Sequence, residues 1–288
     1  MGTRRSATTA SAAGAPAPID TGGPLRPVRG VVSARPDDGL FEHRRIAPHA
    51  ALADLVEHYW FVRWARGGLP AHTARTLPHP CVHWTFEAHT GAGTITGVQT
   101  RLWQRDLGPA GEVLGIKFRP AGFRPWFGRS LHGLRDRVLP AVEVLGGFAT
   151  VVAGAIGAGE VNVRVAQLEA MLLARRPAVP VSVRAVNALV AQLADDRALL
   201  RAGDLAGSDA AALRRLQRQF RDHVGVGPKW VIARYRLHEV LERLRGGAQD
   251  LSALAADLGF ADAAHLSRDF RRIVGVGLAA YRKAWQAV

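Results

Sequence analysis

Residues 216–227, LQRQFRDHVGVG, and residues 266–277, LSRDFRRIVGVG, are two copies of one pattern in which eight of the twelve positions are identical. A near-repeat of this kind indicates a supersecondary unit that is used twice. In the first copy Leu216 and Phe220 lie four positions apart, so they share one face of a helix. Arginines lie on or beside the opposite face in both copies, and a glycine follows the helix in each copy. A helix with one apolar and one basic stripe predicts a unit that enters a groove of DNA.

The second copy lies in a segment with helix-turn-helix anatomy, residues 254–270, LAADLGFADAAHLSRDF. Gly259 permits the tight turn, and Asp262 caps the helix that follows. Leu266 and Phe270 anchor this helix to the core. Its outer, N-terminal half then presents the side chains that a recognition helix directs at base edges, which are Ala263, Ala264, His265, Ser267 and Arg268.

The C-terminal part of the chain, from residue 181 to residue 288, has a helical pattern throughout. We expect seven helices, at roughly 181–194, 198–206, 211–223, 228–245, 250–258, 263–274 and 278–286. Pro228 suits the first position of the long fourth helix, because the missing N–H of proline costs nothing there. This long helix would join the two helix-turn-helix units in one all-α domain.

The chain resembles the AraC/XylS family of transcription regulators. The resemblance is carried by LQRQFRDHVGVGPK (216–229) in the first unit, and by LGFADAAHLSRDFR (258–271) with residues 275–283 in the second. It implies a C-terminal domain of two helix-turn-helix units joined by a long helix. It also implies that the chain is a sequence-specific transcription regulator that binds double-stranded DNA.

The N-terminal region is similar to a domain that accompanies this family in actinobacterial-type regulators. The similarity is carried by HYWFVRW (58–64), LPHPC (77–81) and GIKFRPAGF (115–123). We expect this region to sense a ligand, to dimerise, or to do both. The aromatic residues Trp60, Trp84 and Trp126 suggest either an apolar pocket or a buried core.

The domain organisation that we predict has four parts. Residues 1–38, rich in Ala, Gly, Pro, Ser and Thr, read as a disordered tail. Residues 39–130 read as an α+β domain with a small antiparallel sheet, residues 131–180 as a helical connector, and residues 181–288 as the all-α DNA-binding domain. Within the second part we expect a short helix at 49–59 and strands at 59–64, 81–86, 93–98 and 113–119.

The candidate DNA-binding residues fall into two groups. Base edges are the expected targets of Arg214, Gln217 and Arg218 in the first unit, and of Ala264, His265, Ser267 and Arg268 in the second. Phosphates are the expected targets of Arg221, Lys229, Arg271 and Arg272. The alternatives are a solvated charged face, or salt bridges from Arg218 and Arg268 to Glu239 or Glu242.

The first unit departs from the family pattern at its turn. Ala210 stands where the turn glycine is usual, and Ala212 stands where a capping serine is usual. An alanine with positive φ would be strained, so we expect the first unit to read DNA less sharply than the second. Asp209 or Ser208 is an alternative cap, which would shift the start of the helix. In the second unit Leu278 replaces a usual proline, which we expect to be tolerated.

Charge and cysteine content are consistent with this function. The chain has 38 Lys and Arg against 24 Asp and Glu, a net charge of +14, and this excess favours a polyanionic partner. The alternative is a merely basic surface of an arginine-rich protein. A single cysteine, Cys81, excludes an intrachain disulfide and fits a reducing cytoplasm. We expect no membrane span and no cleaved signal segment.

A competing hypothesis is a metal-responsive regulator. His79, Cys81 and His83 alternate, so on a strand they would share one face and form a soft-metal ligand set. No hydrolase, phosphate-loop or zinc-protease motif is present, so we expect neither enzymatic activity nor a cofactor. The expected partner is double-stranded DNA. RNA polymerase, an unidentified small-molecule effector and a second copy of the chain are further candidates.

Overall fold

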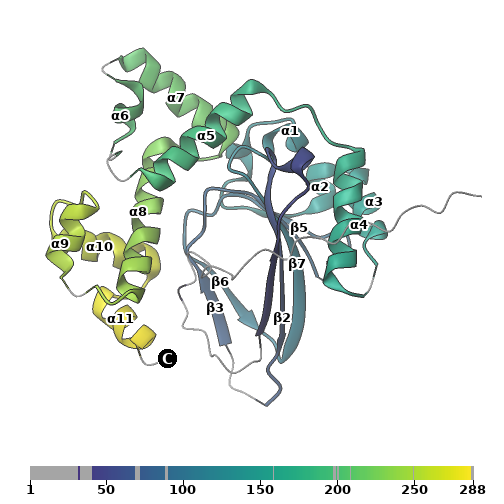
Figure 1. The fold of residues 1–288 in the computed structure, drawn as a ribbon, viewed down its shortest axis with the longest axis horizontal. Helices are drawn as coiled ribbons and strands as arrows, with labels where there is room; N and C mark the ends of the chain where they lie inside the picture. Colours follow the sequence, from purple (N-terminus) through teal and green to yellow (C-terminus); the bar gives the residue numbers. More distant parts are fainter. Residues whose placement is uncertain are drawn as a thin grey trace, which may run out of the picture.

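The computed structural model describes residues 32, 41–68, 72–87, 90–157, 159–196, 199, 201–207, 209–248 and 250–286. The tail expected at residues 1–38 lies outside the described residues, except for Val32. Val32 is buried, and its backbone N–H donates to the carbonyl oxygen of Arg75 over 2.9 Å. The architecture is the predicted one, an α+β N-terminal region followed by an all-α C-terminal region (Figure 1).

A six-stranded antiparallel sheet with strand order β1-β2-β7-β4-β5-β8 forms the centre of the N-terminal region, and β3 pairs with β6 in a separate sheet. The strands are β1 Phe41–Ile46, β2 Val56–Ala65, β3 His72–Thr76, β4 His83–Phe86, β5 Thr94–Thr96, β6 Trp103–Leu107, β7 Ala110–Phe118 and β8 Val138–Pro140. The four predicted strands correspond to β2, β4, β5 and β7. The short strands β1, β3, β6 and β8 were not predicted from the sequence.

The segment 49–59, expected as a short helix, is helical only in the 3₁₀ turn η1, Ala50–Leu52, and β2 begins at Val56. β2 pairs with β1 on one side and with β7 on the other. These two ladders satisfy the backbone of β2 along most of its length. The helix prediction was wrong because tertiary pairing overrides a local helical pattern.

Alternation along β2 decides which side chains enter the core. Tyr59 and Phe61 point into it and are almost completely buried. Trp60 lies on the opposite face of the sheet, in register with Gly115 of β7. A Cβ atom at Gly115 would lie 2.2 Å from the Trp60 ring, so this position requires glycine.

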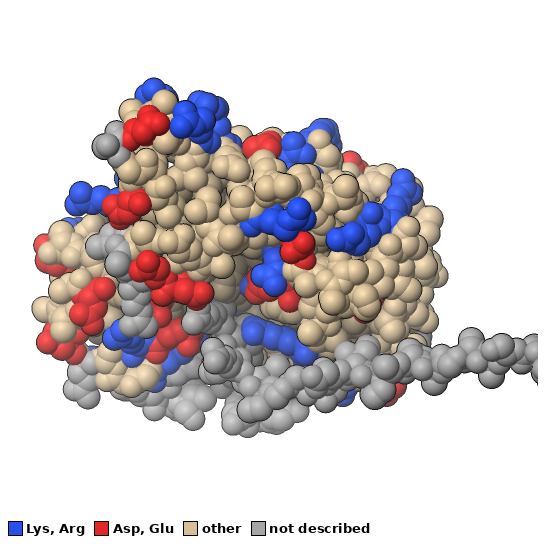
Figure 2. Space-filling view, turned by 45° about the horizontal axis from the view of Figure 1, so that its top comes forward, with Lys and Arg blue, Asp and Glu red and all other residues tan. Residues whose placement is uncertain are grey.

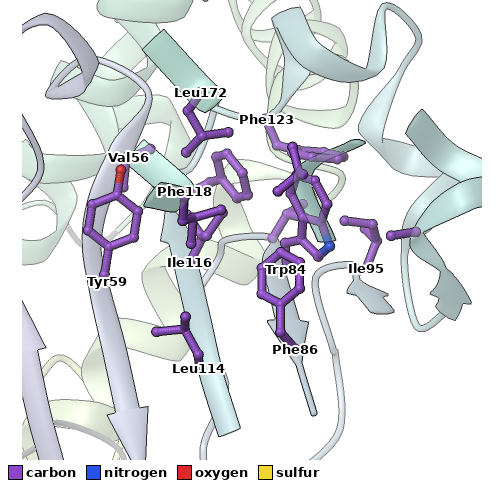
Figure 3. Close-up of a cluster of buried hydrophobic side chains, with 14 of the residues drawn as sticks. Val56, Tyr59, Trp84, Phe86, Ile95, Leu114, Ile116, Phe118, Phe123 and Leu172 are labelled. Atoms are coloured by element: carbon purple, nitrogen blue, oxygen red, sulfur yellow. The ribbon is translucent and has the colours of Figure 1, made fainter. Parts of the chain in front are cut away.

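Helices from residues 124–174 cover the core face of the sheet. The elements here are α1 Arg124–Phe127, η2 Leu131–Leu134, α2 Ala141–Leu145, α3 Gly147–Ala155 and α4 Val161–Ala174. Residues of α2, α3 and α4 belong to the same core as Trp84, Phe118 and Phe123 (Figures 1 and 3). The segment expected as a connector is therefore packed on the sheet of the N-terminal region.

The tryptophans expected around a pocket or a core do not share one site. The Trp84 ring is 1% exposed, and its Nε1 donates to the carbonyl oxygen of Ala92 over 3.1 Å. Trp126 stacks on Phe148, with 5.6 Å between ring centroids. These two rings fill the core, whereas Trp60 lies across the sheet from them. The three tryptophans therefore do not line a common pocket.

Seven helices form the described part of residues 181–288, as predicted. They are α5 Val181–Asp195, α6 Ala202–Ala206, α7 Ala210–His223, α8 Pro228–Arg245, α9 Leu251–Asp257, α10 Ala263–Val274 and α11 Leu278–Gln286. Pro228 is the first residue of the long helix α8, and Gly246 is its C-cap. Helix α8 joins the unit that contains α6 and α7 to the unit that contains α9 and α10 (Figure 1).

Candidate nucleic-acid interface

Helices α7 and α10 each bury one stripe and expose the other. Leu216 and Phe220 of α7 are buried, as are Leu266 and Phe270 of α10. The opposite faces carry the predicted DNA-binding residues except Lys229, which lies in the first turn of α8. Those that are exposed are Arg214, Gln217, Arg218, Arg221, Lys229, Ala264, Arg268, Arg271 and Arg272, while His265 and Ser267 are half-buried.

The exposed cations of these helices are mostly not engaged in ion pairs. Glu239 accepts from Arg243, and Glu242 accepts from Arg245, each over 2.9 Å. The acids proposed as alternative partners are therefore bound along α8 itself. Among the residues that the structure describes, only Arg272 of the candidate cations forms a salt bridge, at 3.1 Å from Asp269. The other basic side chains are available to an anion.

The turn before α10 is built as predicted. Gly259 has φ +68°, and the Asp262 carboxylate accepts from the backbone N–H of His265 over 2.5 Å. His265 itself closes the turn, because its Nδ1 accepts from the backbone N–H of Ala261 over 3.3 Å. Its Nε2 lies 3.6 Å from the carboxylate of Asp269. We infer that His265 positions the recognition helix, which leaves it a smaller part in contacting bases.

The turn before α7 differs from the prediction. Gly207, with φ +62°, supplies the left-handed residue, and the Asp209 carboxylate caps α7 by accepting from the N–H of Ala211 over 2.7 Å. Ala210 is the first residue of α7 and has no positive φ. The expectation that the first unit lacks a turn glycine was wrong, and its cap is Asp209, the alternative that the sequence offered. Both are present at earlier positions, so α7 has 14 residues against 12 in α10.

The Asp209 cap has an electrostatic signature. Backbone N–H groups of Ala212 and then Ala211 hold the pKa of the Asp209 carboxyl below its ordinary value, with a smaller contribution from Arg215. A carboxylate at this end also interacts favourably with the helix dipole. The structure thus confirms Asp209 as the alternative cap, whereas Ser208 lies outside the described residues.

The end of α7 is bound to the N-terminal region. Arg124 Nε lies 3.1 Å from the carboxylate of Asp222, and His132 Nδ1 lies 3.1 Å from the carbonyl oxygen of Gly225. Gly225 also comes close to the backbone of Leu131, where an added Cβ atom would lie 3.0 Å from the carbonyl oxygen. The first unit is therefore held at its C-terminal end by α1 and η2.

Helix α8 adds a buried contact between the two regions. Arg234 is 1% exposed, lies over the Trp230 ring at 4.5 Å, and donates to the carbonyl oxygen of Thr100 over 2.7 Å. Burial lowers the pKa of Arg234 to about 10. Thr100 is fixed in turn by Asp136, which accepts from its backbone N–H over 2.6 Å. Sequence reasoning missed Arg234, although an arginine within the apolar face of α8 was a usable signal.

The surface is not uniformly basic. Figure 2 shows one face on which acidic and basic side chains are interspersed. The net charge of +14 is therefore not gathered into a single patch on this face. Exposed arginines lie along the stripes of α7 and α10.

Comparisons with known proteins agree with this geometry. Residues 205–284 match a family described as a helix-turn-helix domain. An AraC-like transcription regulator of Streptomyces antibioticus is 32% identical over 80 residues, which are 28% of this chain and 26% of that protein. The transcriptional activator RhaS of Pectobacterium carotovorum subsp. carotovorum is 36% identical over 70 residues, which are 24% of this chain and 25% of that protein.

Residues 205–284 form an AraC-type helix-turn-helix domain.

Outside the AraC-type domain, residues 44–140 match a domain of unknown function, DUF6597. Among solved structures, ToxT of Vibrio cholerae O395 is a distant match, with a TM-score of 0.37 and 13% identity over 86% of this chain and 99% of that chain. The chain spans about a quarter of the length of the two regulators that it matches in sequence, at 26% and 25%.

The three residues considered as metal ligands are not brought together. Cys81 Sγ lies 3.4 Å from His83 Nε2, but His79 stacks on His238 of α8, with 4.1 Å between ring centroids. Burial raises the pKa of Cys81 to about 12 and lowers that of His83 to about 3, so the thiol stays protonated and the imidazole neutral. No group of three His, Cys, Asp or Glu side chains in the described residues is arranged to hold a metal ion.

The helices of the described residues include none that is both long enough and apolar enough to cross a bilayer.

Proposed function

We propose that this protein is a sequence-specific transcription regulator that binds double-stranded DNA through α7 and α10 of its AraC-type domain. The observation that carries the proposal is the pairing of two like helices, each with a buried apolar stripe and an exposed basic stripe. Arg218 and Arg268 hold matching positions in the two copies, and arginine pairs with guanine through two hydrogen bonds. The chain needs no catalytic centre or cofactor for this role.

The long helix α8 sets the distance between the two recognition helices. It has 18 residues and therefore spans about 27 Å. Successive major grooves on one face of a duplex recur about every 34 Å. A rigid helix of this length is consistent with two units that enter neighbouring grooves on the same face.

We infer that the N-terminal region regulates DNA binding. Its contacts with Asp222, Gly225 and Arg234 reach both the end of α7 and the middle of α8, so a change in this region can alter the placement of the first unit. The stimulus that this region responds to is either a small-molecule effector or a second copy of the chain. RNA polymerase is a further proposed partner, and the proposed location is the cytoplasm, where DNA is accessible.

The experiment that tests this function is a footprint of the full-length protein on the intergenic DNA beside its own gene. A protected site with binding that weakens as salt rises is the expected result. With about six phosphate contacts, the slope of log affinity against log salt should be near −5. Arg271→Ala should make the slope shallower by about one and weaken all sequences alike. A protein that protects no site, or an unchanged slope in Arg271→Ala, would contradict the proposed function or this contact respectively.

A further inference from the structure

A cleft of about 740 Å³ lies at the end of the core face of the sheet, beside the connection between α3 and α4. This volume is within the range of small-molecule sites in proteins. We call it the α3–α4 cleft. Its lining residues come from β2, β4, β7, the turn after β4, and the ends of the two helices, and they include Phe86, Glu112, Ala153, Ile156, Glu160 and Arg164.

The cleft contains a guanidinium group with an unused donor. Arg164 Nη1 donates to Glu112 over 2.6 Å, while Arg164 Nε is buried without a hydrogen-bond partner. Glu112 is shared, because Arg63 Nε and Nη2 also donate to it, over 3.1 Å and 3.0 Å. The other terminal nitrogen of Arg164, Nη2, donates to no described residue and is left to bind an anionic oxygen of a ligand.

Two further carboxylates line the cleft, Glu87 and Glu160, and they differ in whether a cation binds them. Glu87 is neutralised from outside the cleft by Arg105, whose two terminal nitrogens each lie 2.6 Å from one of its oxygens. Glu160, at the start of α4, is exposed and forms no ion pair with any residue that the structure describes. Glu160 and Arg164 lie one helical turn apart, so the same part of the cleft offers a hydrogen-bond donor to an anion and an acceptor to a cation.

An apolar wall completes the site. Phe86 is buried, and Ala153 and Ile156 are half-buried on the side of α3. We propose that the α3–α4 cleft binds a zwitterion of the amino-acid type with an apolar side chain. Its carboxylate would bind Arg164, its ammonium group would bind Glu160, and its side chain would pack on Phe86, Ala153 and Ile156.

The cleft is positioned to act on the AraC-type domain. Helix α4 begins at the cleft and leads to α5, whose Asn187 binds the backbone of Asp54 over 2.9 Å and that of Ala121 over 2.9 Å. Residues of α5 form one core with Leu216 and Phe220 of α7. The assignment of this ligand as an effector rests on the proposed function, whereas binding to the cleft does not.

The test compares three molecules of one shape by titration calorimetry with the full-length protein. L-Phenylalanine is the zwitterion, 3-phenylpropanoate lacks the ammonium group, and 2-phenylethylamine lacks the carboxylate. We expect L-phenylalanine to bind about tenfold or more tightly than either analogue, the effect of one charge-assisted hydrogen bond. Equal affinities, tighter binding of an analogue, or no binding of L-phenylalanine and of L-leucine would overturn the proposal.

Variants locate the binding site. Arg164→Gln should weaken L-phenylalanine but not 2-phenylethylamine, and Glu160→Gln should weaken L-phenylalanine but not 3-phenylpropanoate. Arg175→Gln is the matched control, because Arg175 caps the other end of α4 and lies over the Phe148 ring at 5.4 Å, as Arg164 lies over the Phe61 ring at 6.0 Å. If Arg164→Gln does not fold, Ala153→Trp fills the cleft without removing a charge and should abolish binding. Binding unchanged in the cleft variants would place the ligand elsewhere.

The footprint of the unliganded protein separates the two proposals. If the cleft variants weaken ligand binding in calorimetry but the protein protects no DNA site, the ligand site is supported and the proposed regulator function is contradicted. A footprint without binding of either amino acid would do the reverse.

Discussion

Asp222 in the first helix-turn-helix unit and Arg272 in the second occupy the same position of the repeated helix, but their surroundings differ. Asp222 lies 3.1 Å from Arg124 of the N-terminal region, whereas Arg272 is exposed and bonded only within α10, to Asp269, among the described residues. The sequence repeat thus builds the same helix twice. At this position one copy binds another part of the chain, and the other carries an exposed arginine.

The turns of the two units do not explain a difference in DNA recognition between them. Each has a glycine with positive φ and an aspartate cap, Gly207 with Asp209 and Gly259 with Asp262. What separates them is how each is attached: the end of α7 is tied to α1 and η2 by polar contacts, whereas the second unit shares an apolar core with Leu77 of the N-terminal region. The difference between the units therefore lies in their contacts with the N-terminal region, and not in their turns.

The largest expected effect is on the two buried aromatic anchors. Phe220 and Phe270 are fully buried, so Phe220→Ala and Phe270→Ala should each lower the free energy of unfolding by about 3–5 kcal/mol. Urea unfolding followed by circular dichroism measures both. A loss well below this range in one variant only would show that the core of that unit is looser than the other.

The next effect concerns base recognition. Arg218→Ala and Arg268→Ala should each cost about 1–3 kcal/mol on the footprinted site and relax the choice of one base pair. Because both turns are intact, we now expect similar losses, in place of the weaker first unit that the sequence suggested. Binding to single-base variants of the site measures this. If only Arg268→Ala loses discrimination between base pairs, the second unit contributes more to base recognition than the first, as the sequence suggested.

The caps provide a smaller effect. Asp262→Ala should destabilise the protein by about 1 kcal/mol, and Asp209→Ala should act in the same direction. The pKa of Asp209 is lowered on folding, so its stabilisation is present at neutral pH and is lost as the pH falls from the ordinary carboxyl value through the lowered one. Thermal melts of both variants between neutral and acidic pH measure this. If the melting temperature of the wild type and that of Asp209→Ala depend on pH in the same way, Asp209 does not stabilise α7 as a charged cap.

The smallest effect on stability is expected where the units differ most. Arg124→Gln breaks the ion pair with Asp222, and the pair is partly exposed, so the loss should be about 0.2–1 kcal/mol. The salt slope of DNA binding should not change, because Arg124 belongs to the N-terminal region. The informative measurement is hydrogen exchange at the C-terminal end of α7, which should become faster while α10 stays unchanged. If exchange in α7 is as slow in Arg124→Gln as in the wild type, the ion pair with Asp222 does not restrain the first unit.

Much of the AraC-type domain could be predicted, because its signals are local. The four-residue spacing of Leu216 and Phe220, the cap Asp262 and the helix-starting Pro228 act within one or two helical turns. The α7 turn was predicted less well, since Gly207 and Asp209 replace the family positions by a shift along the chain. In the N-terminal region, β2 was mistaken in part for a helix because its partners β1 and β7 are distant in sequence.

The sequence by itself determined the two repeated helices, their buried and basic stripes, and the long helix between them, because helical periodicity and capping depend on near neighbours. Only the tertiary structure decided that Arg124 meets Asp222, that Arg234 reaches Thr100, and that Arg164 of α4 borders one cleft with Phe86 of β4. These pairs join residues from separate elements. Their contact depends on how whole layers pack, and no local pattern encodes that arrangement.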